Sequence, residues 1–208
     1  STKAFTLMIL CLHILRLTIE ENEKLIKKEL FDIELDKLDI FSKQFEQVYK
    51  EKNLIKQIAE KYANEQSFFY IGRGICCPLA EEGALKLKEI SYRHAEGYAG
   101  GELKHGPIAL IDKTTPVIAI ISEDNNTTKL LSNVSEIKTR GGVVIGIGPE
   151  NQKTDIFDHY IPCPTIEDPC LQAIFLTIPL QLFAYYTADF LNLDVDQPRN
   201  LAKCVTVE

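Results

Sequence analysis

Short apolar runs, most of them ending on glycine or proline, recur from residue 68 onward and alternate with helical patterns. These runs are residues 68–74, 116–122, 143–149 and 159–164. Runs without polar alternation are typical of strands buried on both faces, and strands separated by helices pair in parallel. The pattern therefore predicts an α/β fold, a doubly wound, mainly parallel sheet flanked by helices.

Helical patterns follow three of these strands. A helix is expected from about Pro78, because proline suits a first helical turn. Residues 127–142 form an amphipathic pattern that ends on two glycines, and residues 169–193 form a long apolar pattern with Pro179 inside it. We expect Pro179 to kink that last helix.

The N-terminal third of the chain is also expected to be helical. Residues 20–66 are charged, with leucines at approximately helical spacing, so we expect two or three amphipathic helices with a break near residues 32–39. The apolar run Phe5–Leu15 is too short to span a bilayer and predicts a buried helix. A buried helix needs a surface to pack against, so we expect a further part of the protein to precede Ser1.

Composition excludes several classes of function. A formal net charge of −7 disfavours nucleic-acid binding, which needs a basic face. The six cysteines include no Cys-x-x-Cys pair, and no histidine stands at ligand spacing to them, so we expect no metal site and no other cofactor. Scattered, reduced cysteines are typical of a cytoplasmic protein, and no membrane span is expected.

The candidate site lies on the helix after residue 78. Glu82, Lys86, Glu89 and Arg93 follow one another at steps of four, three and four residues, so they share one helical face. An ordinary salt-bridged surface stripe would show the same spacing. The glycine-rich segment 94–107 that follows favours function, because a loop shaped so specifically often carries it.

Two further features extend this candidate. His105 follows the charged face, and a carboxylate beside an ammonium group and a histidine is suited to proton transfer, although an isolated histidine is more often structural. The Gly72–Gly74 turn opens a helix and could hold an anion there, or it could be an ordinary tight turn. The turn and the charged face of the helix are both expected near the carboxyl ends of the strands, where open α/β sheets bind ligands.

The segment 194–208 breaks the helical pattern at Pro198. It mixes apolar residues with Arg199 and Lys203, so it could dock on the domain instead of remaining a disordered tail. The simplest alternative for Lys203 is a solvated tail charge.

Two stretches of the chain carry a resemblance to a known family. EEGALKLKEISYRHAEGYAGGELKHGPIALID (residues 81–112) and DVDQPRNLAKCVTVE (residues 194–208), together with STKAFT at the start, strongly resemble glutamine–fructose-6-phosphate amidotransferase (isomerising), also called glucosamine-6-phosphate synthase. The matches keep their order from the first residue to the last. The LKHGP and DQPRNLAK segments are the most specific of them.

The resemblance implies roles for individual residues. Glu89 would shuttle a proton between C1 and C2 of the sugar imine, with Lys86 beside it. His105 would help to open the sugar ring in the site of a neighbouring subunit. Lys203 would engage the sugar carbonyl, and Ser1 would line the sugar site. An aldose–ketose isomerisation needs such a base, such cations and such a ring-opening group.

The resemblance also implies an organisation of the chain. Residues 1–24 would be the closing helix of a first sugar-isomerase (SIS) domain, residues 25–193 a second SIS domain with its leading helices, and residues 194–208 the C-terminal tail. Fructose 6-phosphate and glucosamine 6-phosphate would be the ligands. Ammonia would come from glutamine through a glutaminase domain that this chain lacks, passing along residues 199–202, and the protein would be a homodimer or a higher homo-oligomer.

Two other functions fit an SIS fold. The first is a sugar-phosphate-binding SIS module that regulates without catalysing. Such a module would need neither Lys203 nor the pair of Glu89 and His105. A stand-alone SIS isomerase or deaminase would not need the family-specific tail. The sequence therefore favours an enzyme fragment of the isomerase half, which we expect to be inactive as a synthase by itself.

Overall fold

The structure is a computed structural model that describes residues 2–199, without the side chains of residues 39–42. A five-stranded sheet in the order β2-β1-β3-β4-β5 forms its centre, and every neighbouring pair of strands is parallel. Its strands are β1 (Ser67–Gly72), β2 (His94–Ala99), β3 (Val117–Ile120), β4 (Val144–Pro149) and β5 (His159–Cys163). The prediction of a doubly wound parallel sheet is confirmed.

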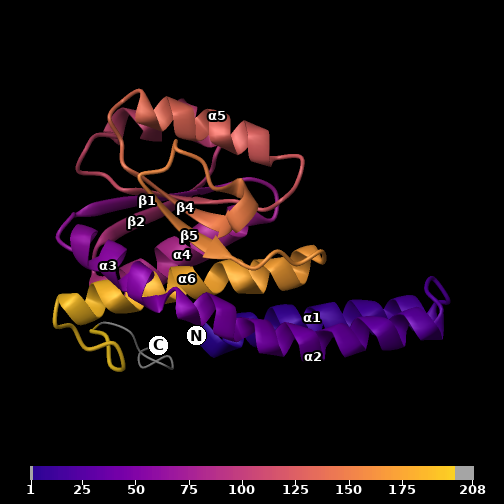
Figure 1. Cartoon of the computed structure of the whole chain (residues 1–208). Helices are drawn as coiled ribbons and strands as arrows, with labels where there is room; N and C mark the ends of the chain where they lie inside the picture. Colours follow the sequence, from indigo (N-terminus) through magenta and orange to yellow (C-terminus); the bar gives the residue numbers. More distant parts are fainter. Residues whose placement is uncertain (1, 200–208) are drawn as a thin grey trace, which may run out of the picture.

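Helices cover both faces of this sheet (Figure 1). They are α1 (Thr2–Asn22), α2 (Lys28–Lys50), α3 (Lys52–Tyr62), α4 (Cys76–Ser91), α5 (Thr127–Lys138) and α6 (Pro169–Phe190). The described residues also form three 3-10 helices, η1 (Glu102–His105), η2 (Pro107–Leu110) and η3 (Glu150–Gln152). The helices α3, α4 and α6 pack on one face of the sheet, and α5 packs on the other.

Strand β1 shows why the apolar runs have no polar alternation. Phe68 and Tyr70 join the hydrophobic cluster under α4 and α6, whereas Phe69 and Ile71 join the cluster under α5. All four side chains are fully buried. Successive strand residues point to opposite faces, so a strand covered on both faces must be apolar throughout.

The prediction of a loop over residues 94–107 is wrong in its first half. Residues 94–99 form strand β2, which lies at the edge of the sheet and pairs with β1 from Ser67↔His94 to Gly72↔Ala99. An edge strand is only partly covered and tolerates polar residues, so it lacks the apolar run that marked the other strands. Gly97 is required here, because a Cβ atom would lie 2.5 Å from the backbone nitrogen of Glu81 in α4.

Most helices of the α/β domain begin and end close to the residues that the sequence predicted. Helix α4 begins at Cys76, two residues before Pro78, and ends where Tyr92 adopts a left-handed conformation with φ of 58°. Helix α6 runs through Pro179 without a break, and the carboxylate of Asp168 caps its first turn by accepting the N–H groups of Cys170 and Leu171. An N-cap of this kind satisfies backbone donors that have no partner within the helix.

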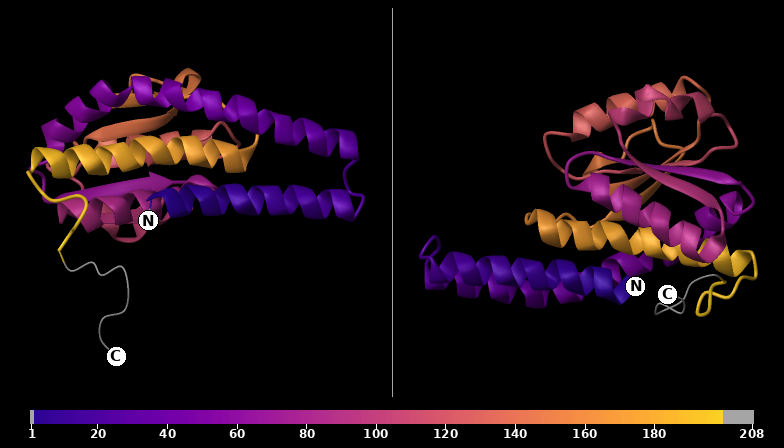
Figure 2. Two further views of the ribbon diagram at one scale, coloured as in Figure 1. Left: turned by 90° about the horizontal axis from the view of Figure 1, so that it is seen from below. Right: turned by 180° about the vertical axis from the view of Figure 1, so that it is seen from behind.

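The N-terminal helices differ from expectation in two respects. The predicted break near residues 32–39 is absent. Helix α2 continues to Lys50, and the chain turns at Glu51. No glycine or proline lies between residues 27 and 66, so nothing in the sequence stops the helix earlier. Helices α1 and α2 form an antiparallel pair that projects from the α/β domain (Figure 2).

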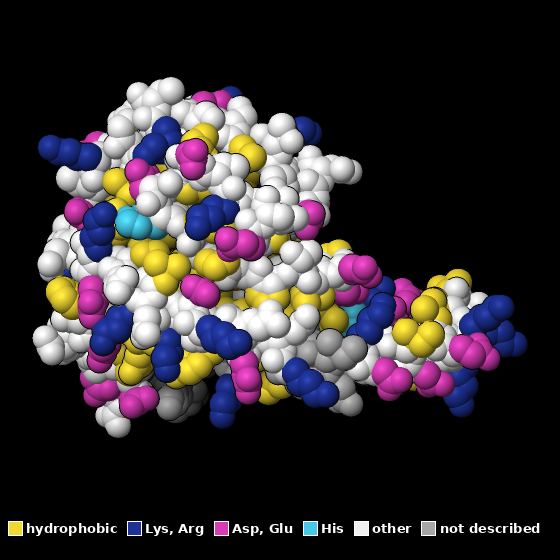
Figure 3. Space-filling view, viewed as in Figure 1, with side chains coloured by type: hydrophobic (Ala, Val, Ile, Leu, Met, Phe, Trp, Pro, Cys, Tyr) yellow, Lys and Arg dark blue, Asp and Glu magenta, His cyan; other side chains and the backbone are white. Residues whose placement is uncertain are grey.

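The prediction that Phe5–Leu15 is a buried helix is also wrong for this chain. Within α1 only His13 and Leu17 are buried. Large apolar side chains of the same helix are exposed, among them Leu7, Leu12 and Leu15. Figure 3 shows hydrophobic side chains at the surface of the projecting pair of helices. The apolar run is thus helical, but much of it has no packing surface within the described chain.

Among residues 2–199, two helices are long and apolar enough to cross a membrane, α1 and α6. Helix α6 is a core helix, because 67% of its most apolar window is buried against the rest of the domain. Helix α1 is 21 residues long, longer than its apolar run, and 11% of its window is buried. Length and composition alone are weak evidence for a membrane span.

Candidate active site

An ion pair near the C-terminal end of α4 lies at the centre of the candidate site. Lys86 Nζ lies 2.7 Å from Glu89 Oε2 and 3.6 Å from Glu82 Oε1. The spacing of three and four residues brings these side chains together on one face of the helix. The Lys86 side chain is only 9% exposed, so this part of the face is more sheltered from water than an ordinary salt-bridged surface stripe.

Shelter from water changes the protonation equilibrium of one of these carboxylates. Burial raises the pKa of Glu82 above its ordinary value, and the positive charge of Lys86 opposes that rise. A buried carboxylate prefers to be neutral unless a cation compensates for the lost hydration. Lys86 therefore lies between two acids and supplies positive charge to both.

An open cavity of about 1270 Å³ adjoins this ion pair. Four parts of the chain form its wall: the start of α1 at Thr2, the end of α4 at Lys86 and Glu89, the second half of α6, and the segment 195–198. Elements far apart in the sequence thus surround one carboxylate and one ammonium group. A polar sugar ligand would find both a base and a cation there.

Gln181 of α6 belongs to this wall and was not predicted from the sequence. Its amide nitrogen Nε2 is buried and has no hydrogen-bond partner within the described part of the chain. A buried donor without a partner is costly, and a bound hydroxyl or carbonyl oxygen would remove that cost. Gln181 lies within an apolar helical run, where one glutamine among leucines was the only signal that could have identified it.

The start of the C-terminal tail docks on α4, as expected. The backbone N–H of Arg199 donates to the hydroxyl of Tyr92 at 2.8 Å, and the Arg199 guanidinium lies 4.2 Å from the centre of the Tyr92 ring. Asp194 accepts the backbone N–H groups of Asp196 and Gln197, which holds the turn before Pro198. Ser1 and Lys203, both predicted to contact sugar, lie outside the described residues, as do residues 200–202.

His105 does not meet Glu89 in the described chain. It is exposed on η1, beyond the carboxyl end of β2, and it does not line the cavity. Glu89 lies thirteen residues along α4 from Cys76, so roughly 20 Å of helix separates it from the carboxyl end of β1. The prediction that the charged face of this helix lies at the carboxyl ends of the strands is therefore wrong for Glu89 and Lys86.

Arg93 also departs from the predicted face. Its Nε donates to the carbonyl oxygen of Ala63 at 3.0 Å, which ties the end of α4 to the end of α3. The helix ends at Ser91, so Arg93 lies beyond the last helical turn. Of the four charges predicted to share the face, Glu82, Lys86 and Glu89 are thus the ones that lie together.

The Gly72–Gly74 turn is occupied by contacts within the protein. Arg73 Nε donates to Asn133 Oδ1 at 3.0 Å, and Gly74 has a φ of 55°, which favours glycine. Near it, the Asp124 carboxylate accepts the Ser122 hydroxyl at 2.8 Å and the Asn126 N–H at 2.6 Å. A carboxylate at this position disfavours a bound anion, so the structure supports the tight-turn alternative.

Comparison with known proteins agrees with this architecture. The family model described as "SIS domain" matches residues 61–188. The chain belongs to the SIS domain family. This SIS domain spans β1 to α6 and includes Lys86 and Glu89, whereas α1 and α2 precede it.

Named relatives resemble the whole chain, but the chain is shorter than they are. It is 46% identical to a glutamine–fructose-6-phosphate aminotransferase (isomerising) of Aquifex aeolicus over 212 residues, which is 100% of this chain and 34% of that protein. A protein of the same name from Buchnera aphidicola is 50% identical over 82% of this chain. The chain thus spans about a third of the length of the curated relatives it matches.

A solved structure of a protein of this kind is also similar to the chain. The C-terminal domain of glucosamine-fructose-6-phosphate aminotransferase from Francisella tularensis superposes with a TM-score of 0.86 at 37% identity. The superposition covers 95% of this chain and 56% of that structure. These findings confirm the resemblance that the sequence suggested.

Proposed function

We propose that this chain forms the C-terminal part of the isomerase half of a glutamine–fructose-6-phosphate aminotransferase. The complete protein would make glucosamine 6-phosphate from fructose 6-phosphate and glutamine. The match of the whole chain to relatives of that name supports the proposal. The single structural observation that carries it is the sheltered Lys86–Glu89 pair in the wall of a cavity large enough for a sugar phosphate.

The chemistry of the site follows from this pair. Glu89 would accept a proton from one carbon of the sugar imine and return it to the neighbouring carbon, because a carboxylate can act as acid and base in turn. Lys86, 2.7 Å away, would stabilise the ionised form of Glu89 before the proton is taken. The side chain of Glu89 is 23% exposed, so it can reach a ligand in the cavity.

Other residues would complete the site in the assembled protein. Thr2 lines the cavity, which supports a place for the adjacent Ser1 among the sugar contacts. The segment 195–198 also lines the cavity, and Lys203, a few residues later in the sequence, would bind the sugar carbonyl. His105 is exposed on η1, away from Glu89 of its own chain, and would serve the site of a neighbouring subunit in a homodimer or larger homo-oligomer.

The wider organisation is part of the same proposal. Residues 1–24 would close a first SIS domain, residues 25–193 would form the second, and residues 194–208 would be the tail. The exposed apolar side chains of α1 favour this division, because a neighbouring domain would cover them. Ammonia would arrive from a glutaminase domain along residues 199–202, and the protein would be cytoplasmic.

A substitution of Glu89 tests the proposal in the full-length protein. Glu89→Gln keeps the size and the hydrogen-bonding capacity of the side chain but removes the proton acceptor. We expect isomerisation to fall about 10²–10⁴-fold. Exchange of the substrate C1 hydrogen with solvent should slow in step, while sugar binding changes little. Glu81→Gln, an exposed acid on the same helix, is the matched control and should retain wild-type activity.

The alternative is a sugar-phosphate-binding module that does not catalyse. That function predicts that Glu89→Gln leaves synthesis within a few-fold of wild type, or that synthesis fails only because sugar no longer binds. Either result would make Glu89 a structural or binding residue.

A further inference from the structure

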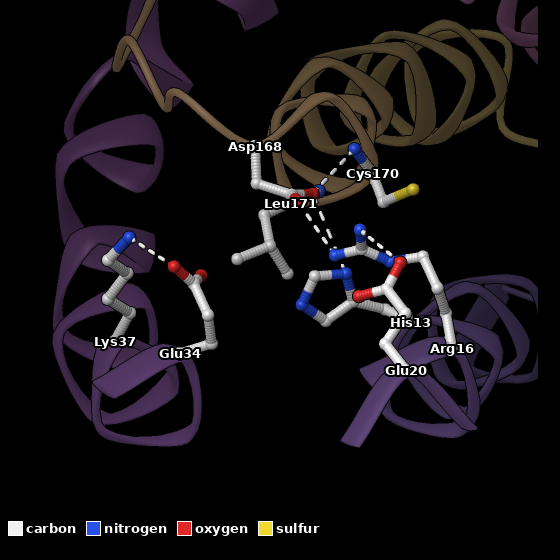
Figure 4. Close-up of polar contacts among 8 residues, drawn as sticks. All are labelled: His13, Arg16, Glu20, Glu34, Lys37, Asp168, Cys170 and Leu171. Atoms are coloured by element: carbon white, nitrogen blue, oxygen red, sulfur yellow. Dashed lines mark hydrogen bonds and ion pairs between the residues drawn. The ribbon is translucent and has the colours of Figure 1, made fainter. Parts of the chain in front are cut away.

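Three chemically different metal-binding side chains meet where α1 packs against the start of α6. They are His13 of α1, Asp168 at the N-cap of α6 and Cys170 in its first turn. One nitrogen, one oxygen and one sulfur atom from these residues all lie within 4.8 Å of one another. Figure 4 shows the His13 ring directed towards Asp168. The expectation of no metal site rested on spacing along the chain, which does not reveal this cluster because α1 and α6 lie at opposite ends of the sequence.

His13 is the residue that points to a ligand. Its side chain is completely covered, and neither ring nitrogen has a hydrogen-bond partner among the residues that the structure describes. The nearest charged atom is Asp168 Oδ1, which lies 3.6 Å from His13 Nδ1. A buried imidazole without partners is unfavourable, and an ion bound to one ring nitrogen would satisfy it.

The donor atoms select the class of ion. Imidazole nitrogen and thiolate sulfur bind zinc-like divalent ions, whereas Ca²⁺ and Mg²⁺ prefer sites built only from oxygen. Ligand atoms around tetrahedral zinc, each about 2.0–2.3 Å from the ion, lie roughly 3.3–3.8 Å apart. The cluster needs to contract by about 1 Å to reach that geometry, and a fourth position would remain for water.

An ion can bind to Asp168 only after Arg16 has released its carboxylate. Its Nη2 lies 3.3 Å from Asp168 Oδ2, and its Nη1 lies 3.4 Å from Glu20 Oε1. Asp168 Oδ1 already accepts the N–H groups of Cys170 and Leu171, so Oδ2 is the oxygen available to an ion. The Arg16 side chain is 46% exposed and can move fully to Glu20, which would release that oxygen.

We propose that His13, Asp168 and Cys170 bind a divalent transition-metal ion of the zinc type, which joins α1 to the N-terminus of α6. The ion would fix the angle of the projecting α1–α2 pair on the α/β domain. Helix α1 begins at Thr2 in the wall of the cavity, so the ion would also hold that wall in place. Its role is structural, because Glu89 is not among its ligands.

Cobalt binding to the 208-residue chain tests this proposal. The chain is reduced, stripped of metal with a chelator and titrated with Co²⁺, a spectroscopic substitute for zinc. We expect one equivalent to bind with a thiolate-to-cobalt charge-transfer band in the near ultraviolet, and added Zn²⁺ to abolish that band. Cys170→Ser should remove the band. Cys11→Ser, an exposed cysteine on α1, is the matched control and should keep it.

Two further variants distinguish a built site from accidental binding. His13→Gln should weaken Co²⁺ binding by at least about tenfold, with circular dichroism confirming the fold. Arg16→Gln should strengthen binding, because it frees Asp168 Oδ2 and removes a nearby positive charge; a merely structural role for Arg16 predicts no such gain. If wild type shows no charge-transfer band, or if the band persists in Cys170→Ser, the proposal is overturned and His13 and Asp168 form an ordinary buried pair.

Discussion

The backbone N–H of Arg199 donates to the hydroxyl of Tyr92 at 2.8 Å, and this bond joins the C-terminal tail to the end of α4. The Arg199 guanidinium also lies over the Tyr92 ring, with 4.2 Å to its centre. Tyr92 follows directly after the helix that carries Lys86 and Glu89. The position of the tail is therefore coupled to the end of the helix on which the proposed base lies.

Removing the Tyr92 hydroxyl should loosen the tail without unfolding the domain. Tyr92→Phe keeps the ring under Arg199 but removes one hydrogen bond, which is worth about 0.5–1.5 kcal/mol. We expect trypsin to cleave after Arg199 about 2–10-fold faster, because cleavage follows the population of the open tail. Tyr49→Phe, which changes an exposed tyrosine on α2, is the control and should cleave at the wild-type rate. Equal rates for Tyr92→Phe and wild type would show that the hydrogen bond does not hold the tail.

A substitution of Gln181 distinguishes a role in ligand binding from a role in packing. Its Nε2 is a buried donor without a partner in residues 2–199, so Gln181→Leu removes an unsatisfied group and keeps most of the volume. We expect the melting temperature of the chain to stay the same or rise. In the full-length protein we expect KM for fructose 6-phosphate to rise about 2–12-fold, the loss of one hydrogen bond to ligand. A large drop in melting temperature with unchanged KM would instead make Gln181 a packing residue.

The fold could be predicted from the sequence wherever burial on both faces left a clear pattern. The interiors of strands β1, β3, β4 and β5 are apolar, because helices cover both sides of them, although β5 begins with the half-buried His159. Strand β2 lies at the edge, carries His94 and Glu96, and needs Gly97 for the close approach of α4, so its residues resemble a loop. No local pattern distinguishes such an edge strand from a shaped loop.

Only the part of the candidate site that lies on the single helix α4 could be predicted from the sequence. Helical spacing places Lys86 beside Glu82 and Glu89, and the structure confirms those contacts. The same spacing argument is wrong for Arg93, because α4 ends before this residue. Its Nε instead donates a hydrogen bond to the carbonyl oxygen of Ala63. Gln181 and Thr2 reach the cavity through tertiary packing, which sequence spacing does not encode.

His159 at the start of β5 should make stability depend on pH. Its Nε2 lies 3.0 Å from the Tyr62 hydroxyl and 3.2 Å from Lys61 Nζ. Burial, and next the positive charge of Lys61, lower the pKa of His159 below its ordinary value of 6.5. The unfolded chain therefore binds the proton more readily than the folded chain does. The stability that depends on a neutral His159 is complete above about pH 6.5 and is lost as pH falls through the lower folded pKa.

Thermal unfolding at two pH values checks this prediction. The melting temperature of wild type should fall between about pH 7.5 and pH 5.5, and His159→Gln should show a smaller fall because it lacks the titrating group. His94→Gln, which changes a 57% exposed histidine on β2, is the control and should fall as wild type does. An identical fall in wild type and His159→Gln would assign the pH dependence to other groups.

The separation of His105 from Glu89 gives the last prediction, which concerns assembly. His105 is exposed on η1, whereas Glu89 lies in the wall of the cavity near the far end of α4. If each proposed site takes its histidine from the other subunit, a hybrid dimer can contain one intact site even when both parent proteins are inactive. We therefore expect mixed full-length Glu89→Gln and His105→Ala proteins to regain activity after subunit exchange, up to about a quarter of wild type when half the dimers are hybrids and each has one of two working sites. The two parents mixed without exchange provide the baseline. If exchange is verified and activity does not recover, the site is made within one chain, and η1 would have to move towards α4 for His105 to take part.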